Sequence, residues 1–443
     1  MTRVCVIGAG SSGLAACQAL HARGIPFDCF EAGSAVGGNW RYGNDNGMSS
    51  AYRSLRSKSS RQGMQYPAFP MPDSYPTYPR HELIAQYLDE YVDHFGFRGT
   101  IKFQTEVISA RPALPGGWDV TVGRRGAATV RTQRYSAVVV ASGHHWDPRY
   151  PDPAIPGAAG FGGQVMHSHA YRAPEAFAGR RVLILGVGNS GCDIAAEVSQ
   201  VAGRTLLAVR RGAHVVPKYL CGMPTDHLTL LRFGAFAPRW LQRSAVKLLT
   251  RAARCHPSRF GLPPPDYRIL DIPPTVSDNL LSRLAHGYIA VRPAVARFDG
   301  NRVLFANGNT EPVDAVIYCT GYKISHPFLD ASRAGVGEGD VGLYRRVVSP
   351  KQSGLFFIGL VQPIGAIMPI AEMQSHWVAD LLDGRALLPP RPVMAREIIS
   401  YRAVAARRQI RSGRHAIQVD FQAYLRQIRA ERRAGAERRQ RAA

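Results

Sequence analysis

The sequence predicts an α/β protein in which two units of the same kind share one chain, the second inserted in the first. Two observations support this fold class. An apolar run entering a G-x-G-x-x-G turn occurs at residues 3–13 and again at residues 181–191. Each copy is followed much later by a second apolar run that closes on a Ser/Thr-Gly pair, Ser142-Gly143 or Thr320-Gly321. This repeat is typical of two Rossmann-like dinucleotide-binding domains.

The composition is that of a globular protein with an unusual charge. At 443 residues, with 45% hydrophobic and 20% charged residues, the chain is long enough for two or three domains. Its formal charge of +23 comes almost wholly from arginine, since only six lysines occur. Seven cysteines form no C-x-x-C pair and no zinc spacing, so we expect no metal site and a reduced, cytoplasmic protein. We expect neither a signal peptide nor a membrane span.

Residues 3–31 contain the complete fingerprint of the first domain. We expect a strand at 4–7, a helix at 14–22 and a second strand at 27–30 that ends on Glu31. The first glycine permits a tight turn, the second lets a pyrophosphate approach the backbone, and the third lets the helix pack on the strand. The turn residues are Gly8, Gly10, Ser11, Ser12 and Gly13. Glu31 is placed to accept a hydrogen bond from a ribose 2′-hydroxyl.

The chain after the acid continues the same ligand edge. The paired glycines Gly37 and Gly38, followed by Asn39 and Trp40, suit a second close backbone approach to the ligand. The irregular but aromatic segment 41–80 is expected to be ordered over it. Then come a helix at 82–95, a strand at 101–107 and an antiparallel excursion before the closing strand.

The second unit repeats this plan with a different charge. We expect strands at 182–185 and 205–209, with a helix at 190–201 between them. The second strand ends on Arg210, where the first unit has Glu31. Because arginine donates to a 2′-phosphate whereas an acid accepts from a free hydroxyl, we expect NADPH rather than NADH. The alternative is an arginine that only stacks on adenine. Arg211 and Lys218 are further candidate cations.

The C-terminal residues 401–443 form a basic tail with twelve arginines and three acids. Such a tail suits an anionic surface, a membrane or nucleic acid, although a solvated terminus is the favoured interpretation. Few apolar residues follow Arg426, so we expect this end to bury little core and to be dispensable for catalysis. Residues 219–290 contain no motif.

A third pattern lies between the two glycine turns: Phe161, Gly163, His167 and Tyr171 have the spacing F-x-G-x-x-x-H-x-x-x-Y. With this block and a few other segments, over about residues 1–420, the sequence resembles the class B flavin-containing monooxygenases, which oxygenate nitrogen and sulfur. The other matching segments are Gly37–Trp40, Gly186–Gly191, Thr320–Tyr322 and Phe357–Gly365.

The resemblance implies FAD on a first domain (1–157 and 326–400), NADPH on a second (158–325), and O2 as cosubstrate. A flavin hydroperoxide would then oxygenate a small nucleophile, an amine or a sulfide. The residues that the resemblance adds to the FAD site are Ser59 and Val107. Those of the NADPH site are Ser57, Lys58, Gly186, Gly188, Asn189, Ser190, Gly191 and Asp193, beside Arg210, Arg211 and Lys218.

One residue departs from the family pattern. Where the family has an asparagine beside the reactive face of the flavin, this chain has Lys58. A lysine there stabilises an anionic flavin state, or disturbs NADP⁺ docking and releases hydrogen peroxide, or points to solvent. The sequence leaves these three alternatives open.

Other interpretations remain beside this one. Baeyer–Villiger relatives carry tryptophan in place of Tyr171, which counts against ketone oxidation without excluding it. A disulfide reductase would need a redox-active cysteine pair. A flavin-bound, NADPH-responsive binding protein with weak NADPH oxidase activity is the non-enzyme alternative. We expect His167 to position the two domains rather than to carry protons. A homodimer is compatible with the sequence, and no specific nucleic-acid recognition is expected.

Overall fold

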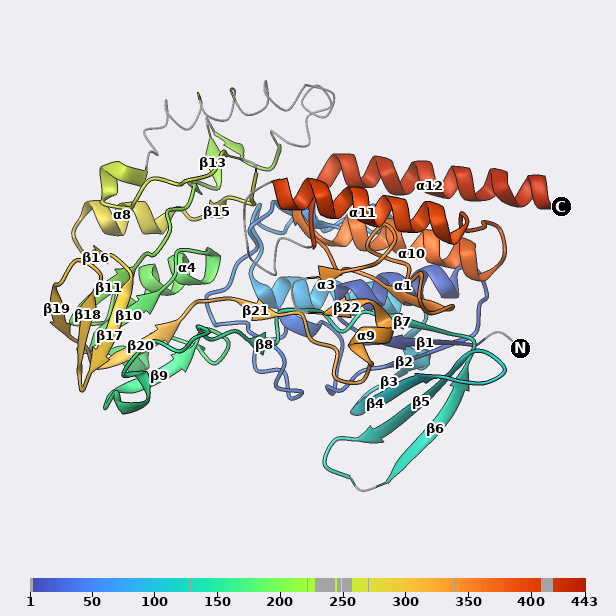
Figure 1. Ribbon diagram of the computed structural model, residues 1–443, viewed down its shortest axis with the longest axis horizontal. Helices are drawn as coiled ribbons and strands as arrows, with labels where there is room; N and C mark the ends of the chain where they lie inside the picture. Colours follow the sequence, from blue (N-terminus) through green and yellow to red (C-terminus); the bar gives the residue numbers. More distant parts are fainter. Residues whose placement is uncertain are drawn as a thin grey trace. The chain divides into compact units, whose positions relative to one another are not determined.

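The computed structural model describes residues 3–127, 129–220, 222–227, 257–269, 271–337, 340–407 and 417–443, with the isolated positions 244 and 248. The chain forms two compact units (Figure 1). Unit 1 consists of Met1–Ala51, Ser59–Asp147 and Lys323–Ala443, and unit 2 of Tyr52–Lys58 and Pro148–Tyr322. The second unit is therefore inserted in the first, and it also takes a seven-residue segment from the chain of unit 1.

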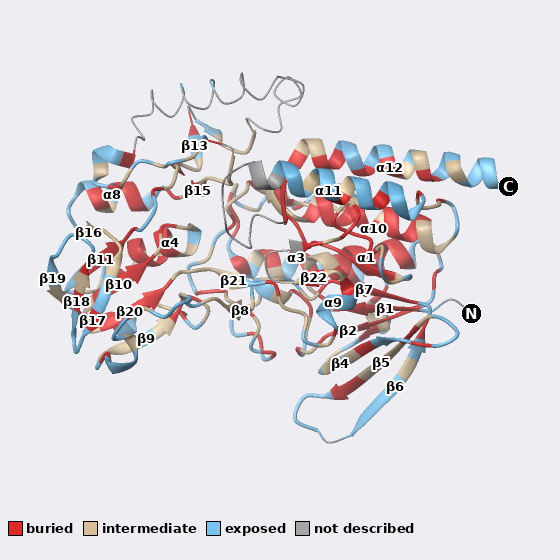
Figure 2. Ribbon diagram, in the orientation of Figure 1, coloured by how far each residue is buried: buried red, intermediate tan, exposed pale blue. Residues whose placement is uncertain are grey.

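Unit 1 is built on a five-stranded parallel sheet with the order β24-β7-β1-β2-β3. Every residue of its three central strands is buried (Figure 2), as expected for a parallel sheet covered on both faces. The strands are β1 (Val4–Ile7), β2 (Phe27–Phe30), β3 (Ile101–Lys102), β7 (Ala137–Val140) and β24 (Leu355–Phe357). The predicted strands at 4–7 and 27–30 are confirmed.

Helices stack beside this sheet in unit 1. Helix α1 packs against α3 and α10, and α10 in turn packs against α12 (Figure 1). The bounds of the helices are α1 (Ser11–His21), α2 (Arg61–Met64), α3 (His81–His94), α9 (Ala331–Ala334), α10 (Met368–Leu382), α11 (Arg391–Arg407) and α12 (Phe421–Ala442).

The expectation that the chain beyond Arg426 buries little core is wrong. Ile428 in α12 is fully buried, and Arg432 donates to Asp380 of α10 at 2.7 Å. The hydroxyl of Tyr424 accepts from Gln374 at 2.7 Å and donates to a backbone carbonyl at 2.6 Å. The buried residues of α12 recur at helical spacing and form one continuous stripe: Phe421, Tyr424, Leu425, Ile428, Glu431 and Gly435.

The predicted strand at 101–107 is two strands. The chain turns at Gln104, whose φ is 50°, between β3 of the parallel sheet and β4. Strand β4 instead joins an antiparallel sheet of β4 (Thr105–Pro112), β5 (Trp118–Arg124) and β6 (Val130–Tyr135). Short pairs complete unit 1: β22 (Val336–Gly337) with β23 (Asp340–Val341), and β25 (Gln362–Ile364) with β26 (Gln418–Asp420).

Unit 2 has a second five-stranded parallel sheet with the order β16-β11-β10-β20-β9. Its strands are β9 (Gln164–His167), β10 (Arg181–Leu185), β11 (Arg204–Ala208), β16 (Ile289–Arg292) and β20 (Ala315–Tyr318), and its described helices include α4 (Asn189–Val198) and α8 (Asn279–Ala285). An antiparallel sheet joins β17 (Val295–Asp299), β18 (Arg302–Phe305) and β19 (Thr310–Pro312).

Four short strands lie in the excursion of unit 2: β12 (Val215–Val216), β13 (Tyr219–Leu220), β14 (Met223–Pro224) and β15 (Thr275–Val276). Strands β8 (Asp147–Pro148) and β21 (Tyr322–Lys323) fall where the chain passes from one unit to the other. In the described part of the chain, no helix combines the length and apolarity needed to cross a membrane.

Candidate functional site

Both glycine turns are enforced by the same steric contacts. A Cβ at Gly13 would lie 1.8 Å from the carbonyl oxygen of Gly8, and a Cβ at Gly191 would lie 2.0 Å from that of Gly186. The first glycine of each turn has a left-handed backbone, with φ of 98° at Gly8 and 111° at Gly186. Only glycine satisfies both requirements, so the two turns have the same local geometry.

The closing strands meet the turns in the same way. A Cβ on Gly8 would lie 2.9 Å from the carbonyl of Ala141, directly after β7. A Cβ on Gly186 would lie 2.7 Å from the carbonyl of Cys319, directly after β20. The repeat predicted from Ser142-Gly143 and Thr320-Gly321 is therefore present in three dimensions.

The helices after both turns begin without a side-chain cap. The residue before α1 is Gly10 and the residue before α4 is Gly188; both are extended, and neither helix start has a capping side chain. The first N–H groups of a helix need an acceptor, and an uncapped glycine start leaves them to a phosphate. The middle glycines are also open: a Cβ on Gly10 meets only Gly38 Cα at 3.6 Å, and one on Gly188 meets nothing within 4 Å. Both turns therefore fit a dinucleotide pyrophosphate.

Glu31 at the end of β2 is buried and fixed in place. One of its carboxylate oxygens accepts from the backbone N–H of Ala9 at 2.8 Å. The other accepts from the N–H of Gly33 at 2.8 Å and from the amide of Asn46 at 3.0 Å. A carboxylate has about four acceptor positions, so one remains for a ligand hydroxyl. This arrangement fits the predicted ribose contact.

The other residues predicted for FAD have different surroundings within unit 1. Gly38 and Trp40 belong to a short helical turn, where a Cβ on Gly38 would lie 2.9 Å from Gly10. Asn39 accepts through its side-chain oxygen from the N–H and hydroxyl of Ser50 at 2.8 and 2.9 Å. Val107 lies in the hydrophobic core of this unit. The structure thus brings Gly38 next to the glycine turn, while the Val107 side chain faces the core.

The two arginines after β11 differ in their partners. Arg211 pairs with Asp266 at 2.5 Å and lies over the ring of Tyr267, with 5.6 Å to its centroid. Arg210 is exposed, and among the described residues its side chain has no partner. Arg210 is therefore the arginine available for a nucleotide phosphate.

Lys58 is held inside unit 2 by helix α4. Its ammonium lies 2.7 and 2.6 Å from the two carboxylate oxygens of Asp193 and donates to the carbonyl of Val276 at 3.1 Å. The hydroxyl of Tyr52 donates to the same carboxylate at 2.5 Å. These two donors, Lys58 and Tyr52, thus fix both ends of the segment 52–58 to one acid of α4.

Glu197, one helical turn after Asp193, completes this attachment. It accepts from the hydroxyl of Tyr171 at 2.9 Å and from Ser54. Burial raises the pKa of Glu197 and also the pKa of Tyr171. Acids at positions i and i+4 lie on one face of a helix, so α4 presents one acidic face to the segment 52–58.

Two of the predicted cations of the NADPH site, Lys58 and Lys218, lie near this face. Burial lowers the pKa of Lys218, and the positive charge of Lys58 lowers it further. The side-chain oxygen of Asn189 accepts from the N–H of Val276 at 2.9 Å, beside the second glycine turn. Ser57 is fully buried. Lys58, Lys218 and the turn thus lie together in unit 2, whereas Ser59 falls in unit 1.

The F-x-G-x-x-x-H-x-x-x-Y residues pack within unit 2. Phe161 contacts Phe298 at 5.3 Å between ring centroids, and a Cβ on Gly163 would lie 2.4 Å from the carbonyl of Asp314. His167 is 1% exposed and accepts at Nδ1 from the N–H of His169 at 3.1 Å. Burial lowers the pKa of His167 to about 4. A histidine that is neutral at neutral pH suits a positioning role.

Sequence reasoning did not identify Tyr52, Ser54 and Glu197 as parts of this site. The one indication in the sequence was the i, i+4 spacing of Asp193 and Glu197, since two acids on one helix face need hydrogen-bond partners when they are partly buried. The sequence around these acids does not show which distant segment supplies the partners.

Comparisons with known proteins agree with this geometry. The family model described as flavin-binding monooxygenase-like matches residues 1–436. Flavin-containing monooxygenase 5 of Cavia porcellus is 36% identical over 432 residues, which cover 95% of this chain and 80% of that protein. Human flavin-containing monooxygenase 3 is 34% identical over 409 residues, covering 89% and 76%.

Solved structures share the fold. S-allyl-L-cysteine S-oxygenase from Allium sativum has a TM-score of 0.72 at 24% identity, covering 99% of this chain and 92% of that one. A closed crystal structure of cyclohexanone monooxygenase has a TM-score of 0.74 at 18% identity, covering 99% and 98%.

Two dinucleotide-binding units on one chain define a flavin enzyme that also takes a pyridine nucleotide. The chain belongs to the flavin-binding monooxygenase family. It is a flavin monooxygenase that uses FAD, NADPH and O2.

Proposed function

We propose that this enzyme transfers one oxygen atom from O2 to a soft nucleophile, an amine nitrogen or a sulfide sulfur. The observation that carries the proposal is the pattern of identity. Flavin-containing monooxygenase 5 of Cavia porcellus and human flavin-containing monooxygenase 3 are 36% and 34% identical over most of the chain, whereas cyclohexanone monooxygenase shares only the fold at 18%.

Unit 1 would hold FAD through backbone N–H groups and the carboxylate of Glu31. The start of α1 at Gly10 offers N–H groups to the pyrophosphate, and Glu31 has one acceptor position for a ribose hydroxyl. Bound there, the flavin accepts hydride and activates oxygen, chemistry that no side chain can supply. The protein contributes binding, orientation and exclusion of water.

The residues of unit 2 would hold NADPH. The start of α4 at Gly188 receives the pyrophosphate, and Arg210 donates to the 2′-phosphate. Lys58, which Asp193 orients, adds positive charge beside the same turn. Orientation by this partly buried acid removes rotamer freedom from the lysine before the nucleotide binds.

Baeyer–Villiger oxidation is the second candidate, because cyclohexanone monooxygenase has the same fold over nearly the whole chain. Tyr171 argues against this candidate, because Baeyer–Villiger relatives carry tryptophan at this position. In this chain the Tyr171 hydroxyl donates a hydrogen bond to Glu197 instead.

For the cellular compartment, we propose the reducing cytoplasm, which the buried free thiols of Cys5, Cys17 and Cys29 support.

The test offers three substrates to the purified FAD-loaded enzyme with NADPH and air. The substrates are benzyl methyl sulfide, N,N-dimethylbenzylamine and cyclohexanone, and the measurement is product formed per NADPH consumed. We expect sulfoxide or N-oxide close to one per NADPH. Lactone as the only product would replace the proposal with the Baeyer–Villiger assignment.

A further inference from the structure

A chain of buried hydrogen bonds joins the C-terminal helix α12 to the segment after β24. The side-chain N–H of Gln374 in α10 donates to the hydroxyl of Tyr424 at 2.7 Å, and that hydroxyl donates to the carbonyl of Arg345 at 2.6 Å. The side-chain oxygen of Gln374 accepts from the backbone N–H of Gly359 at 2.9 Å. Gln374 and Tyr424 are both buried. Helix α10 thus links α12 to Gly359.

Each group in this chain of bonds has one possible role. A backbone carbonyl accepts and a backbone N–H donates, so the hydroxyl of Tyr424 donates to Arg345 and accepts from Gln374. The amide of Gln374 is thereby oriented with its oxygen toward Gly359. Without the hydroxyl, the amide would lose the partner that decides its orientation, and a buried donor would be left unpaired.

Gly359 is the point at which this chain of bonds meets the first glycine turn. Its φ is 79°, and a Cβ there would lie 2.0 Å from the Oγ of Ser12. Ser12 follows Ser11 in the first turn of α1, whose N–H groups would receive the FAD pyrophosphate. The backbone at Gly359 is therefore packed directly against the start of α1, and a shift of Gly359 would displace Ser12.

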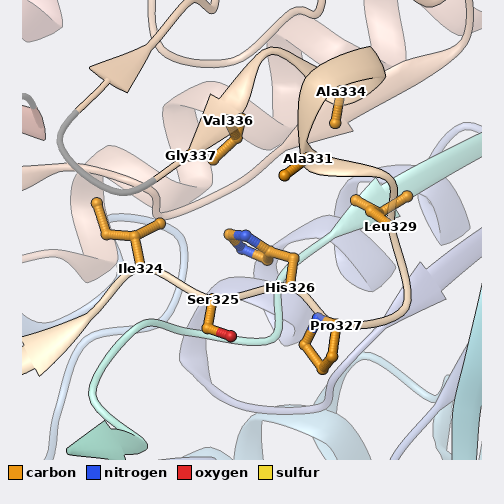
Figure 3. Close-up of a pocket in the computed structure, with 9 residues that line it drawn as sticks. All are labelled: Ile324, Ser325, His326, Pro327, Leu329, Ala331, Ala334, Val336 and Gly337. Carbon is orange, nitrogen blue, oxygen red and sulfur yellow. The ribbon is translucent and has the colours of Figure 1, made fainter. Parts of the chain in front are cut away.

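The end of β24 depends on this hydrogen bond for its position. The N–H of Ile358 still donates to Val140 of β7, at 2.9 Å, and that of Gly359 is the first beyond the sheet. Phe357 packs against the ring of His326, with 5.3 Å between centroids, and His326 lines a cavity of about 240 Å³ (Figure 3). Free volume leaves the lining atoms without contacts on one side, so packing there constrains the strand end less than a filled core would.

Helix α10 also holds a second segment against the start of α1. Tyr66 is fully buried and donates through its hydroxyl to the carbonyl of Ser11. Two residues further on, the N–H of Ala68 donates to Glu372 of α10 at 3.2 Å. Helix α10 therefore acts on the first turn of α1 through two side chains, and Gln374 is the one that α12 orients.

We propose that Tyr424 and Gln374 are positioning residues for FAD. Through the amide of Gln374, α12 holds Gly359 against Ser12 and so fixes the first turn of α1 in the form that receives the pyrophosphate. The inference rests on the proposed placement of FAD at the start of α1, and it gives the C-terminal helix a role in cofactor binding beyond its contribution to stability.

The test compares the FAD affinity of full-length variants. Tyr424→Phe removes the hydroxyl, and Gln374→Met removes both amide groups while nearly keeping the length of the side chain. Ile428→Ala is the matched control, because Ile428 lies one helical turn after Tyr424 in the same buried stripe of α12 and has no polar side-chain group. Each FAD-loaded enzyme is diluted in series, free FAD is separated by ultrafiltration, and the Kd is calculated from the free and bound fractions.

We expect Tyr424→Phe and Gln374→Met each to raise the Kd of FAD about tenfold, the effect of about one buried hydrogen bond. The double variant should resemble either single variant, because both residues act through one chain of bonds. Ile428→Ala should change the Kd by less than about twofold, although loss of a buried side chain makes it at least as destabilising. Denaturant titrations measure that stability, and FAD loss that follows the unfolding free energy across all variants would overturn the inference.

Gly10→Val separates this inference from the placement on which it rests. If Gly10→Val binds FAD as tightly as the unaltered enzyme, the placement is wrong and the inference falls with it. If Gly10→Val loses FAD while a folded Tyr424→Phe or Gln374→Met enzyme keeps the original affinity, the placement stands and the positioning role is refuted. Product formed from a sulfide or an amine tests the proposed oxygen transfer separately, because FAD affinity does not depend on it.

Discussion

Replacing Arg210 with alanine should weaken NADPH binding and leave NADH binding nearly unchanged. Among the described residues the Arg210 side chain has no partner, so its removal breaks no contact that the structure describes. A hydrogen bond to a charged group contributes roughly 1.5–3 kcal/mol, which is about 10- to 100-fold in affinity. NADH lacks the 2′-phosphate, and its affinity should change by less than about twofold on the same reasoning.

Arg211→Ala is the matched control. Arg211 is paired with Asp266 at 2.5 Å, with both side chains substantially exposed, and such surface pairs contribute about 0–1 kcal/mol. Its removal should therefore change neither nucleotide's affinity by more than about fivefold. The assay is anaerobic stopped-flow reduction, in which bleaching of the flavin is followed against the concentration of each nucleotide.

Two results would refute this reasoning. Equal loss of NADPH and NADH in Arg210→Ala would show that the guanidinium stacks on adenine rather than binding the phosphate. A larger loss in Arg211→Ala would show that Asp266 releases Arg211 when the nucleotide arrives.

The remaining predictions use the same units. In Gly10→Val the added atoms meet little protein but would occupy the pyrophosphate site of FAD, so the protein should be folded and colourless. Gly188→Val should disturb only the NADPH site, so this variant should stay yellow but resist reduction by NADPH. Absorbance spectra test both expectations. Ile428→Ala should lower unfolding free energy by about 2–5 kcal/mol, measured by denaturant titration, and an unchanged midpoint would mean that α12 does not dock. In the folded protein His167 stays neutral down to about pH 4, whereas in the unfolded chain it becomes protonated near pH 6.5. The free energy of unfolding should therefore fall by up to about 3 kcal/mol as the pH is lowered from about 6.5 to about 4. Denaturant titrations at several pH values should show a smaller fall in His167→Phe. Lys58→Met, which strips Asp193 of its cation, should weaken NADP⁺ binding about tenfold and raise hydrogen peroxide released per NADPH; if neither changes, Lys58 acts on neither cofactor.

The two strand–turn–helix units could be predicted from sequence because local rules determine them. Glycine spacing fixes the turn, an apolar run fixes a buried parallel strand, and the steric contacts at Gly13 and Gly191 show why no other residue suffices. The second strand of each unit followed from the same pattern, but the end of the one in unit 2 was predicted wrongly. Strand β11 ends at Ala208, so Val209 occupies the position that Glu31 has in unit 1, and Arg210 lies one residue further along the chain.

Long-range contacts account for what the sequence did not reveal. The segment 52–58 has no periodicity, and its membership of unit 2 depends on Asp193 and Glu197 far along the chain. Similarly, Arg210 and Arg211 were both candidate cations, and only the pairing of Arg211 with the distant Asp266 shows that they differ in their partners. The buried stripe around Ile428 was the exception, since its helical spacing was visible beneath the high arginine content.

The most direct test of oxygen transfer by this chain uses O2 labelled with the heavy oxygen isotope. The FAD-loaded enzyme turns over benzyl methyl sulfide with NADPH under this gas, and mass spectrometry reads the sulfoxide. Our account predicts one heavy oxygen atom per sulfoxide and one sulfoxide per NADPH. Unlabelled sulfoxide, or NADPH consumption that yields only hydrogen peroxide, would contradict it.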